Sequence, residues 1–244
     1  MKRFLSILLG FVLTASAALA IDSRSALTTV LKTCEISFKL SGGAFPCLKV
    51  SEGADPLLSY AVLREPMASQ RTIFSPLAEI PGIEDPRLLG PGAPNFFSMA
   101  WNERSLAVPE GRDQWDGVAL AINAAVNRTQ DHLHIHMGCL APKVTAALAK
   151  TKVSSIEFRR LGIKLERQTY WALFVPADDL SGINPFKLVA DQVFLAKRFM
   201  GGVTIGVIGG ERDGQRGFFI LANAMGPKSG HDASAESLID PSCG

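Results

Sequence analysis

The stretch TQDHLHIHMG, residues 129–138, places three of the four histidines of this chain at every second position. In a β-strand successive side chains point to opposite faces, so strict alternation of two kinds of residue is typical of a strand with two different faces. One face carries the imidazoles of His132, His134 and His136, and the other carries the apolar side chains of Leu133, Ile135 and Met137. The apolar face is expected to anchor the strand in the core. The imidazoles must then be solvated or hydrogen-bonded, since buried unpaired polar groups are costly.

The segments around the histidines extend this strand into a hairpin. Residues 115–123, WDGVALAIN, have the composition of a buried strand, and residues 124–131 are rich in turn-forming residues. The two strands are therefore predicted to pair antiparallel. Pro142, at the start of PKVTAALAK, begins a short helix directly after the histidine strand.

The rest of the chain supplies further helices and strands. Apolar residues at helical spacing predict helices over residues 22–40, 96–107 and 185–199. Runs rich in β-formers predict strands over residues 60–65, 70–77 and 170–176 and a hairpin over 201–223, whereas prolines and glycines make 80–94 an irregular loop. Together these segments predict an α+β fold, with an antiparallel sheet flanked by helices.

A single domain after an N-terminal leader is expected, because 244 residues lie near the upper range for one compact domain. Lys2 and Arg3 precede a mostly apolar run that ends in small residues at Ala20, which is the layout of a secretory signal peptide over residues 1–20. Cleavage after Ala20 is one outcome. An uncleaved anchor is the other, since Phe4 to Ala20 carry no charge and reach the short limit for spanning a bilayer. Residues 21–244 are then expected to form a soluble body on the far side of the membrane.

Four cysteines agree with export, because disulfides persist in oxidising compartments. Of the three possible pairings we favour Cys34–Cys47, a short loop worth about 3 kcal/mol in chain entropy, and Cys139–Cys243, which ties the tail to the histidine segment. The absence of any C-x-x-C spacing argues against a zinc site. The formal net charge is +2 and the basic residues are dispersed, so nothing indicates nucleic-acid binding.

Alternating histidines can hold a metal or carry out chemistry themselves. At about 3.3 Å per residue, the Cα atoms of His132 and His136 lie roughly 13 Å apart, so three rings on a straight strand do not easily converge on one ion. Two adjacent rings could, with further ligands from His231 or from acidic residues. A row of imidazoles is better suited to an extended phosphate chain, since one ring can attack phosphorus while a neighbour donates to oxygen near neutral pH.

The segment from His132 to Met137 resembles the His-φ-His-φ-His-φ-φ motif of the histidine-triad (HIT) superfamily of nucleotidyl hydrolases and transferases. Asn123 closes the preceding strand where HIT proteins have an asparagine, and Thr129 falls where they often have a phosphate-contacting hydroxyl. Gly138 departs from the motif, which usually has a second apolar residue there. The resemblance implies a HIT-like antiparallel sheet and a reaction that requires no metal and no other cofactor.

A closer resemblance within that superfamily is to bacterial CDP-diacylglycerol pyrophosphatases. The leader, a cysteine three residues after the last histidine, and four segments carry this resemblance: PNFFSMAW (94–101), VALAIN (118–123), RTQDHLHIH (128–136) and SAESLIDPSC (234–243). The family implies hydrolysis of CDP-diacylglycerol to CMP and phosphatidate, at the membrane that holds the lipid.

The same resemblance implies roles for individual residues. His134 is the nucleophile, which attacks the cytidylyl phosphorus and forms a covalent nucleotidyl-histidine that water then cleaves. His132 contacts the bridging or leaving oxygen, and His136 orients the site. The N-terminus of the helix begun by Pro142 adds partial positive charge. Further candidates for phosphate or ribose contact are Asn123, Thr129, Arg128 and Gln130, of which Gln130 is equally well explained as a turn residue.

The implied substrate also predicts partners and a location. We expect a nucleotide-linked lipid as substrate, a membrane surface as partner, and the periplasmic side of the bacterial inner membrane as location. HIT proteins are often dimers, which leaves a homodimer open. The acyl chains either stay in the bilayer or enter a groove facing loop 80–97. Two other functions stay open: a HIT-type hydrolase or transferase of soluble nucleotides, and a secreted metal-binding protein that uses His132 and His134.

Overall fold

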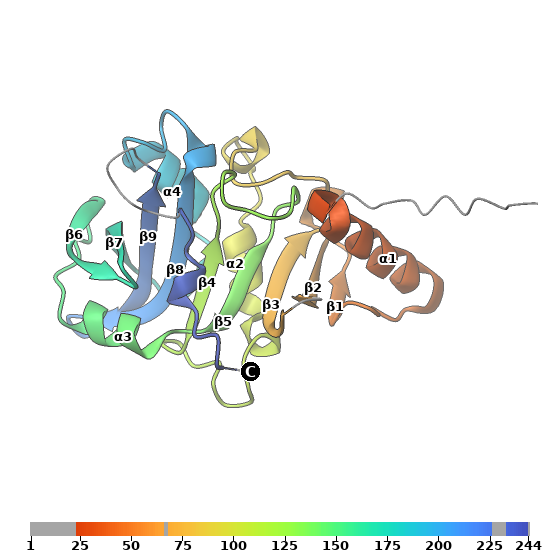
Figure 1. Ribbon diagram of the computed structural model, residues 1–244, viewed down its shortest axis with the longest axis horizontal. Coiled ribbons are helices and arrows are strands. Elements are labelled where there is room, and N and C mark those ends of the chain that lie inside the picture. Colours follow the sequence, from red (N-terminus) through yellow and green to blue (C-terminus); the bar gives the residue numbers. More distant parts are fainter. Residues whose placement is uncertain (1–22, 66–67, 226–232, 244) are drawn as a thin grey trace, which may run out of the picture.

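The computed structural model describes residues 23–65, 68–225 and 233–243, so the expected leader and His231 lie outside the described residues. Its centre is one nine-stranded sheet in the order β1-β2-β3-β5-β4-β8-β9-β7-β6, in which every pair of neighbours is antiparallel (Figure 1). The strands are β1 (Lys49–Ser51), β2 (Tyr60–Glu65), β3 (Ala68–Pro76), β4 (Val118–Ile122), β5 (Ile135–Cys139), β6 (Arg159–Leu165), β7 (Gln168–Pro176), β8 (Val203–Arg212) and β9 (Gln215–Ala224). The predicted antiparallel sheet is confirmed.

Four α-helices within the described ranges cover the two faces of this sheet. They are α1 (Ala26–Ser41), α2 (Phe96–Asn102), α3 (Pro142–Ala149) and α4 (Pro185–Gln192). The largest core cluster joins α2 and α4 to one face of β4, through residues such as Leu120. The opposite face of β4, which carries Ala119 and Ala121, packs with α3 and with the C-terminal segment, while α1 covers β2 and β3 on that side. Helices therefore flank both faces of the sheet, as the sequence predicts.

The histidine segment has the two faces that its alternation predicts. Leu133, Ile135 and Met137 all belong to the core on the α2 and α4 side. The expected strand is shorter at its start, however, because β5 begins only at Ile135. His132 and His134 lie in the extended segment before it, where the backbone N–H of Leu133 bonds to the Ile80 carbonyl of a loop instead of to a neighbouring strand.

Two expected helices are shorter than predicted, and two strands have no counterpart in the sequence prediction. The helix expected over 96–107 ends at Asn102 and continues as a separate 3-10 turn, and α4 ends at Gln192 because Val193 adopts an extended conformation. β1 has only three residues and β6 reads RRLGIKL, so neither carries the long apolar alternation that identifies a strand.

Both favoured disulfides are present, Cys34–Cys47 and Cys139–Cys243. The first ties α1 to the loop that leads into β1. The second joins the end of β5 to the C-terminal segment. None of the helices in the described part of the chain is long and apolar enough to cross a membrane.

Candidate active site

His134 lies at the end of the connection between β4 and β5 and is almost fully buried. Its Nδ1 is 2.6 Å from the carbonyl oxygen of His132. Because a carbonyl oxygen only accepts hydrogen bonds, Nδ1 must carry the proton, and Nε2 then keeps an unshared electron pair. Burial of the ring, and then the charge of the nearby His136, lower the pKa of His134 to about 4. The ring is therefore neutral near pH 7 and presents a nucleophilic nitrogen.

His136 lies beside it, with the two ring centroids 5.0 Å apart. Its Nδ1 is 2.9 Å from Oε1 of Glu65, at the end of β2, and its Nε2 is 3.3 Å from Oε1 of Glu236, in a 3-10 turn of the C-terminal segment. Burial alone would raise the pKa of Glu65, but its contact with His136 and the charges of His136 and Arg71 lower that pKa below its ordinary value. Each nitrogen of the His136 ring thus faces a carboxylate.

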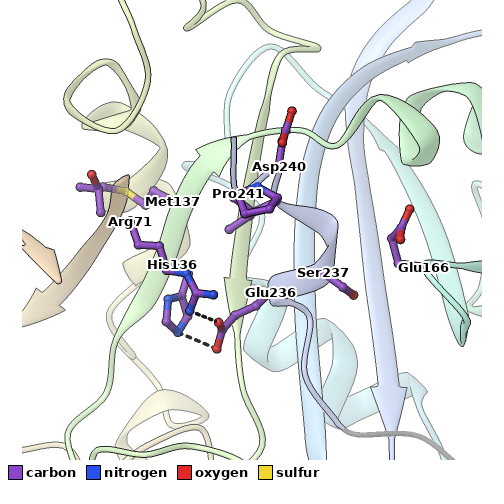
Figure 2. A pocket seen from close by; sticks show the side chains of 10 residues that line it. Arg71, His136, Met137, Glu166, Glu236, Ser237, Asp240 and Pro241 are labelled. Atoms are coloured by element: carbon purple, nitrogen blue, oxygen red, sulfur yellow. Dashed lines mark hydrogen bonds and ion pairs between the residues drawn. The ribbon is translucent and has the colours of Figure 1, made fainter. Parts of the chain in front are cut away.

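Glu236 is the residue on which this cluster converges. Its carboxylate also accepts a hydrogen bond from Nη1 of Arg71 at 2.8 Å, and dashed lines in Figure 2 mark the contacts of Glu236 with Arg71 and His136. The side-chain N–H of Asn123, just after β4, donates to the other carboxylate oxygen. The buried Oδ1 of Asn123 has no hydrogen-bond partner among the described residues. One carboxylate therefore joins a residue of β3, a residue of β5 and the residue that follows β4.

A glycine lets the C-terminal segment reach β5. A Cβ atom at Gly138 would lie 2.6 Å from Cγ2 of Ile239, closer than packed atoms come. Backbone hydrogen bonds and the Cys139–Cys243 disulfide hold this segment along the end of β5. Gly138, which departs from the HIT motif, thus allows the segment that carries Glu236 to pack directly against β5.

His132 is bonded through both ring nitrogens. Nε2 donates to the carbonyl oxygen of Pro76 at 2.9 Å, so Nδ1 is the acceptor of the Thr28 hydroxyl at 3.0 Å. Burial lowers the pKa of His132, which keeps the ring neutral near pH 7. His132 therefore has no free nitrogen for a ligand, and its carbonyl group orients His134.

The other predicted residues divide between the site and its support. Thr129 is exposed at the rim of the pocket that contains His134. The Gln130 amide bonds to backbone groups at the start of α1 and holds that helix against the histidine segment. The guanidinium of Arg128 lies in ion pairs with Glu84 at 2.6 Å and Asp131 at 3.0 Å.

Two pockets meet at the cluster and share Arg71, His136 and Glu236. The first has a volume of 390 Å³, contains His134, and has an apolar wall made of residues from α1, β2 and β3: Ala26, Leu27, Val30, Leu63 and Ile73. The second, shown in Figure 2, has a volume of 320 Å³ and lies along the C-terminal segment. His132 instead lines a narrow crevice, which it shares with Asn123 and His134. His134 and His136 thus line a common pocket, whereas His132 meets His134 only at the crevice.

Sequence reasoning missed Glu65, Arg71 and Glu236. The first two end and begin neighbouring predicted strands, so a β2–β3 hairpin was a signal that they meet. Nothing in the sequence places Glu236 against His136, because that contact depends on how the C-terminal segment crosses β5. In the part of the chain that the structure describes, no group of three or more His, Cys, Asp or Glu side chains is arranged to hold a metal ion.

The site thus contains a neutral, oriented imidazole and, next to it, a second imidazole that faces two carboxylates, one of which also binds an arginine. Such a group on an antiparallel sheet is typical of enzymes that use nucleophilic and acid–base chemistry. The sequence profile of the CDP-diacylglycerol pyrophosphatase family matches residues 22–244, and the chain belongs to this family. A CDP-diacylglycerol pyrophosphatase from Yersinia pestis is 36% identical over 170 residues, which make up 67% of this chain and 64% of the relative. The alignment thus spans just under two thirds of that relative.

Proposed function

We propose that the protein hydrolyses CDP-diacylglycerol to CMP and phosphatidate, with His134 as the nucleophile. The hydrogen bond from Nδ1 of His134 to the His132 carbonyl carries this proposal, because it leaves Nε2 unprotonated on a ring that lines a pocket. Membership of the CDP-diacylglycerol pyrophosphatase family and the Yersinia relative support the choice of substrate.

The reaction takes two displacements at one phosphorus atom. Nε2 of His134 attacks the cytidylyl phosphorus, the bond from that phosphorus to the bridging oxygen breaks, and its electron pair leaves with phosphatidate. Water then attacks the same phosphorus and loses a proton to the solvent. The phosphorus–nitrogen bond breaks, its electron pair returns to Nε2, and CMP is released.

The neighbouring residues stabilise charge and fix geometry. Arg71 and the His136 ring line the pocket that holds His134, where the charge of Arg71 can offset negative charge on phosphate oxygens as it develops. Asn123 and Thr129 are proposed to donate to the same oxygens. The guanidinium of Arg128 is held in ion pairs with Glu84 and Asp131, so its proposed phosphate contact requires a rearrangement.

We assign supporting roles to two predicted site residues. His132, with both nitrogens bonded, acts by holding His134 rather than by touching the leaving oxygen directly. Gln130, whose amide bonds to backbone groups at the start of α1, acts by holding that helix against the histidine segment rather than by touching the ribose. Both roles are consistent with the covalent route above.

We also propose that this chemistry and the fold are HIT-like, and that the protein acts on the periplasmic side of the inner membrane, anchored by its leader or peripheral after cleavage. The two disulfides favour an oxidising compartment. Hydrolysis of soluble nucleotides fits such a location less well. A metal site on His132 and His134 is disfavoured, because both nitrogens of His132 are hydrogen-bonded. A homodimer remains a proposal without an assigned interface.

The decisive experiment traps the intermediate. The full chain is mixed with CDP-diacylglycerol labelled at the cytidylyl phosphate, without added metal, and quenched rapidly under acid-free conditions. A labelled peptide that carries the nucleotide on His134 is the expected product. An adduct on another residue, or turnover retained by His134→Ala, would overturn the nucleophile assignment. If the wild type releases no CMP, the assignment of CDP-diacylglycerol as the substrate is wrong.

A further inference from the structure

Several exposed apolar side chains lie in or near the segment FLAKRF, residues 194–199, which follows α4. Phe194 is 64% exposed and Phe199 57%, values that leave most of each ring in water. Leu195 in the same segment, Val126 in the connection between β4 and β5, and Met225 after β9 are also exposed. These five side chains define what we call the FLAKRF surface. Exposed apolar groups gathered at one place are characteristic of contact sites.

Backbone and side-chain contacts bring the three segments of the FLAKRF surface together. The N–H of Ala125 bonds to the carbonyl of Gly201 at 2.8 Å, and the N–H of Met225 bonds to the carbonyl of Gly202 at 3.0 Å. Both glycines lie under the ring of Phe199, where a Cβ would come within 3.0 Å of it. The segments that carry the surface therefore lie together at one end of the sheet, where Figure 1 shows the end of α4.

The same surface carries positive charge. Lys197 and Arg198 are exposed, and the Arg198 guanidinium lies 4.5 Å from the centre of the Phe194 ring. Neither residue forms an ion pair with any described carboxylate. Aromatic rings beside unpaired basic residues suit the interface of an anionic bilayer, where rings enter the headgroup region and cations meet phosphate groups.

A second apolar group, formed by Ile36, Leu40, Phe45 and Leu48, lacks this charge pattern. Its neighbouring cations Lys39 and Lys49 are held in ion pairs with Glu35 and Glu103. It also lies near the C-terminal end of α1, whereas the N-terminal end of α1 packs on the histidine segment. It therefore serves as a matched control for the FLAKRF surface.

The FLAKRF surface is also linked to the active site along the chain. Val126 belongs to the connection that runs directly into His132 and His134. Residues 23 and 24, which follow the uncharged stretch Phe4–Ala20 in the sequence, bond to the same connection through Gln130 and Asp131. The chain thus enters the described body at the end of the sheet where this surface lies.

We propose that the FLAKRF surface docks the protein on an anionic lipid bilayer, so that the pocket with His134 faces the membrane edge. Phe194, Leu195 and Phe199 insert at headgroup depth, and Lys197 and Arg198 contact lipid phosphates. The proposal rests on the proposed function for its purpose, since a lipid substrate must be reached at the membrane, but binding can be measured without turnover.

The test places one reporter on each apolar group. All four described cysteines are paired, so Leu195→Cys and Leu40→Cys each supply one free thiol for an environment-sensitive fluorophore. Each full-length variant is mixed with vesicles of phosphatidylglycerol and chain-brominated phosphatidylcholine. Quenching by bromine is expected to be severalfold stronger at position 195. Equal quenching at both positions, stronger quenching at position 40, or none at either would overturn the proposal.

Charge variants give a second readout. Lys197→Gln with Arg198→Gln is expected to weaken binding to these anionic vesicles about thirtyfold, since each basic residue near an anionic surface contributes about a fivefold factor. Binding to pure phosphatidylcholine vesicles should change little. An unchanged affinity for anionic vesicles would contradict the role of the two cations.

Activity separates docking from catalysis. Phe194→Ser with Phe199→Ser should lower turnover of vesicle-borne substrate about tenfold or more, because burial of one Phe side chain alone is worth at least about tenfold. Turnover of a short-chain CDP-diacylglycerol kept below its micellar concentration should be unchanged. Equal losses on both substrates would contradict docking. Failure of the wild type on both would instead reject the proposed function and leave the quenching result standing.

Discussion

The two hairpins at the centre of the sheet are built in opposite ways. β8 and β9 have ten residues each, pair in an unbroken register, and meet at a tight turn in which Asp213 and Gly214 both have positive φ, as hairpin turns with the right twist require. β4 and β5 have five residues each and are joined by residues 123–134, whose backbone bonds to Arg24, Ile80 and Gly201. The regular β8–β9 hairpin is held by the hydrogen bonds between its own two strands. In the irregular β4–β5 hairpin the connection is held by other segments of the chain, and it carries two of the histidines of the active site. We therefore expect variants in β8 and β9 to change stability, and variants around β4 and β5 to change turnover.

The largest expected effect is on turnover in the irregular hairpin. His134→Ala removes the nitrogen that bonds to phosphorus, so kcat should fall at least about 10³-fold, the scale of losing a principal catalytic group. The thermal unfolding midpoint should stay within a few degrees of wild type. Steady-state kinetics and circular dichroism measure the two quantities, and a loss of activity that merely follows a loss of folding would remove the distinction between the hairpins.

Phe218→Ala tests the regular hairpin. Phe218 is fully buried on β9 and packs against Trp101 and Trp115. Its truncation should lower the free energy of unfolding by about 3–5 kcal/mol, the usual cost of emptying such a site. Urea denaturation measures this change. The kcat of the folded fraction should stay within a factor of two, and a specific loss of kcat would mean that β9 takes part in chemistry.

The protonation of His134 sets the pH response of the irregular hairpin. Burial and the charge of His136 lower the pKa of His134 to about 4, and only the neutral ring is nucleophilic. A plot of kcat/KM against pH should stay level from pH 7 to about 5 and fall tenfold per unit below about 4. A midpoint near 6.5, the ordinary value for histidine, would show that the ring is not desolvated as described.

The same pKa shift has a consequence for stability. Between about pH 6.5 and 4 the unfolded chain binds a proton at this residue while the folded chain does not, so the free energy of unfolding falls as pH decreases. The contribution is complete above about pH 6.5 and changes by at most about 1.4 kcal/mol per pH unit across that window. The lowered pKa of His132 acts in the same direction. In His134→Ala the decline across this window should be shallower.

A smaller effect is expected from the carboxylate that joins the strands. Glu236→Gln keeps the size of the side chain but removes the charge that holds Arg71 and faces His136, so kcat should fall about 10- to 100-fold with little change in unfolding. Glu157→Gln is the matched control, because Glu157 is exposed and, within the described ranges of the chain, its carboxylate pairs only with Arg159. Equal kcat values for the two variants would show that Glu236 has no role in the reaction.

The smallest effect concerns the crossing at Gly138. Gly138→Val places side-chain atoms where Ile239 lies and should displace the segment that carries Glu236, which lowers kcat by about 3- to 10-fold if half of the free-energy contribution of Glu236 is lost. Ile239→Ala in the same chain should restore most of the activity, because it frees that space. If the second substitution restores nothing, the contact between these residues does not position Glu236.

The sequence predicts what depends on local pattern. Alternation at residues 132–137 predicts the two faces of the histidine segment, and the cysteine positions, together with the expectation of export, led to both disulfides. It does not predict contacts set by long-range crossing. The bond between Thr28 and His132 and the convergence of Glu236 on His136 depend on how α1 and the C-terminal segment pack over the sheet. These contacts decide which histidine keeps a free nitrogen.

The two outer strands of the sheet disfavour strand pairing with another copy of the chain. β1 offers only three residues, and β6 presents exposed Arg159, Arg160 and Lys164 along its length. Two copies that met edge to edge along β6 would bring like charges together, which is a common protection against runaway strand addition. The wide sheet therefore ends at borders that discourage aggregation, although its interior is almost entirely apolar.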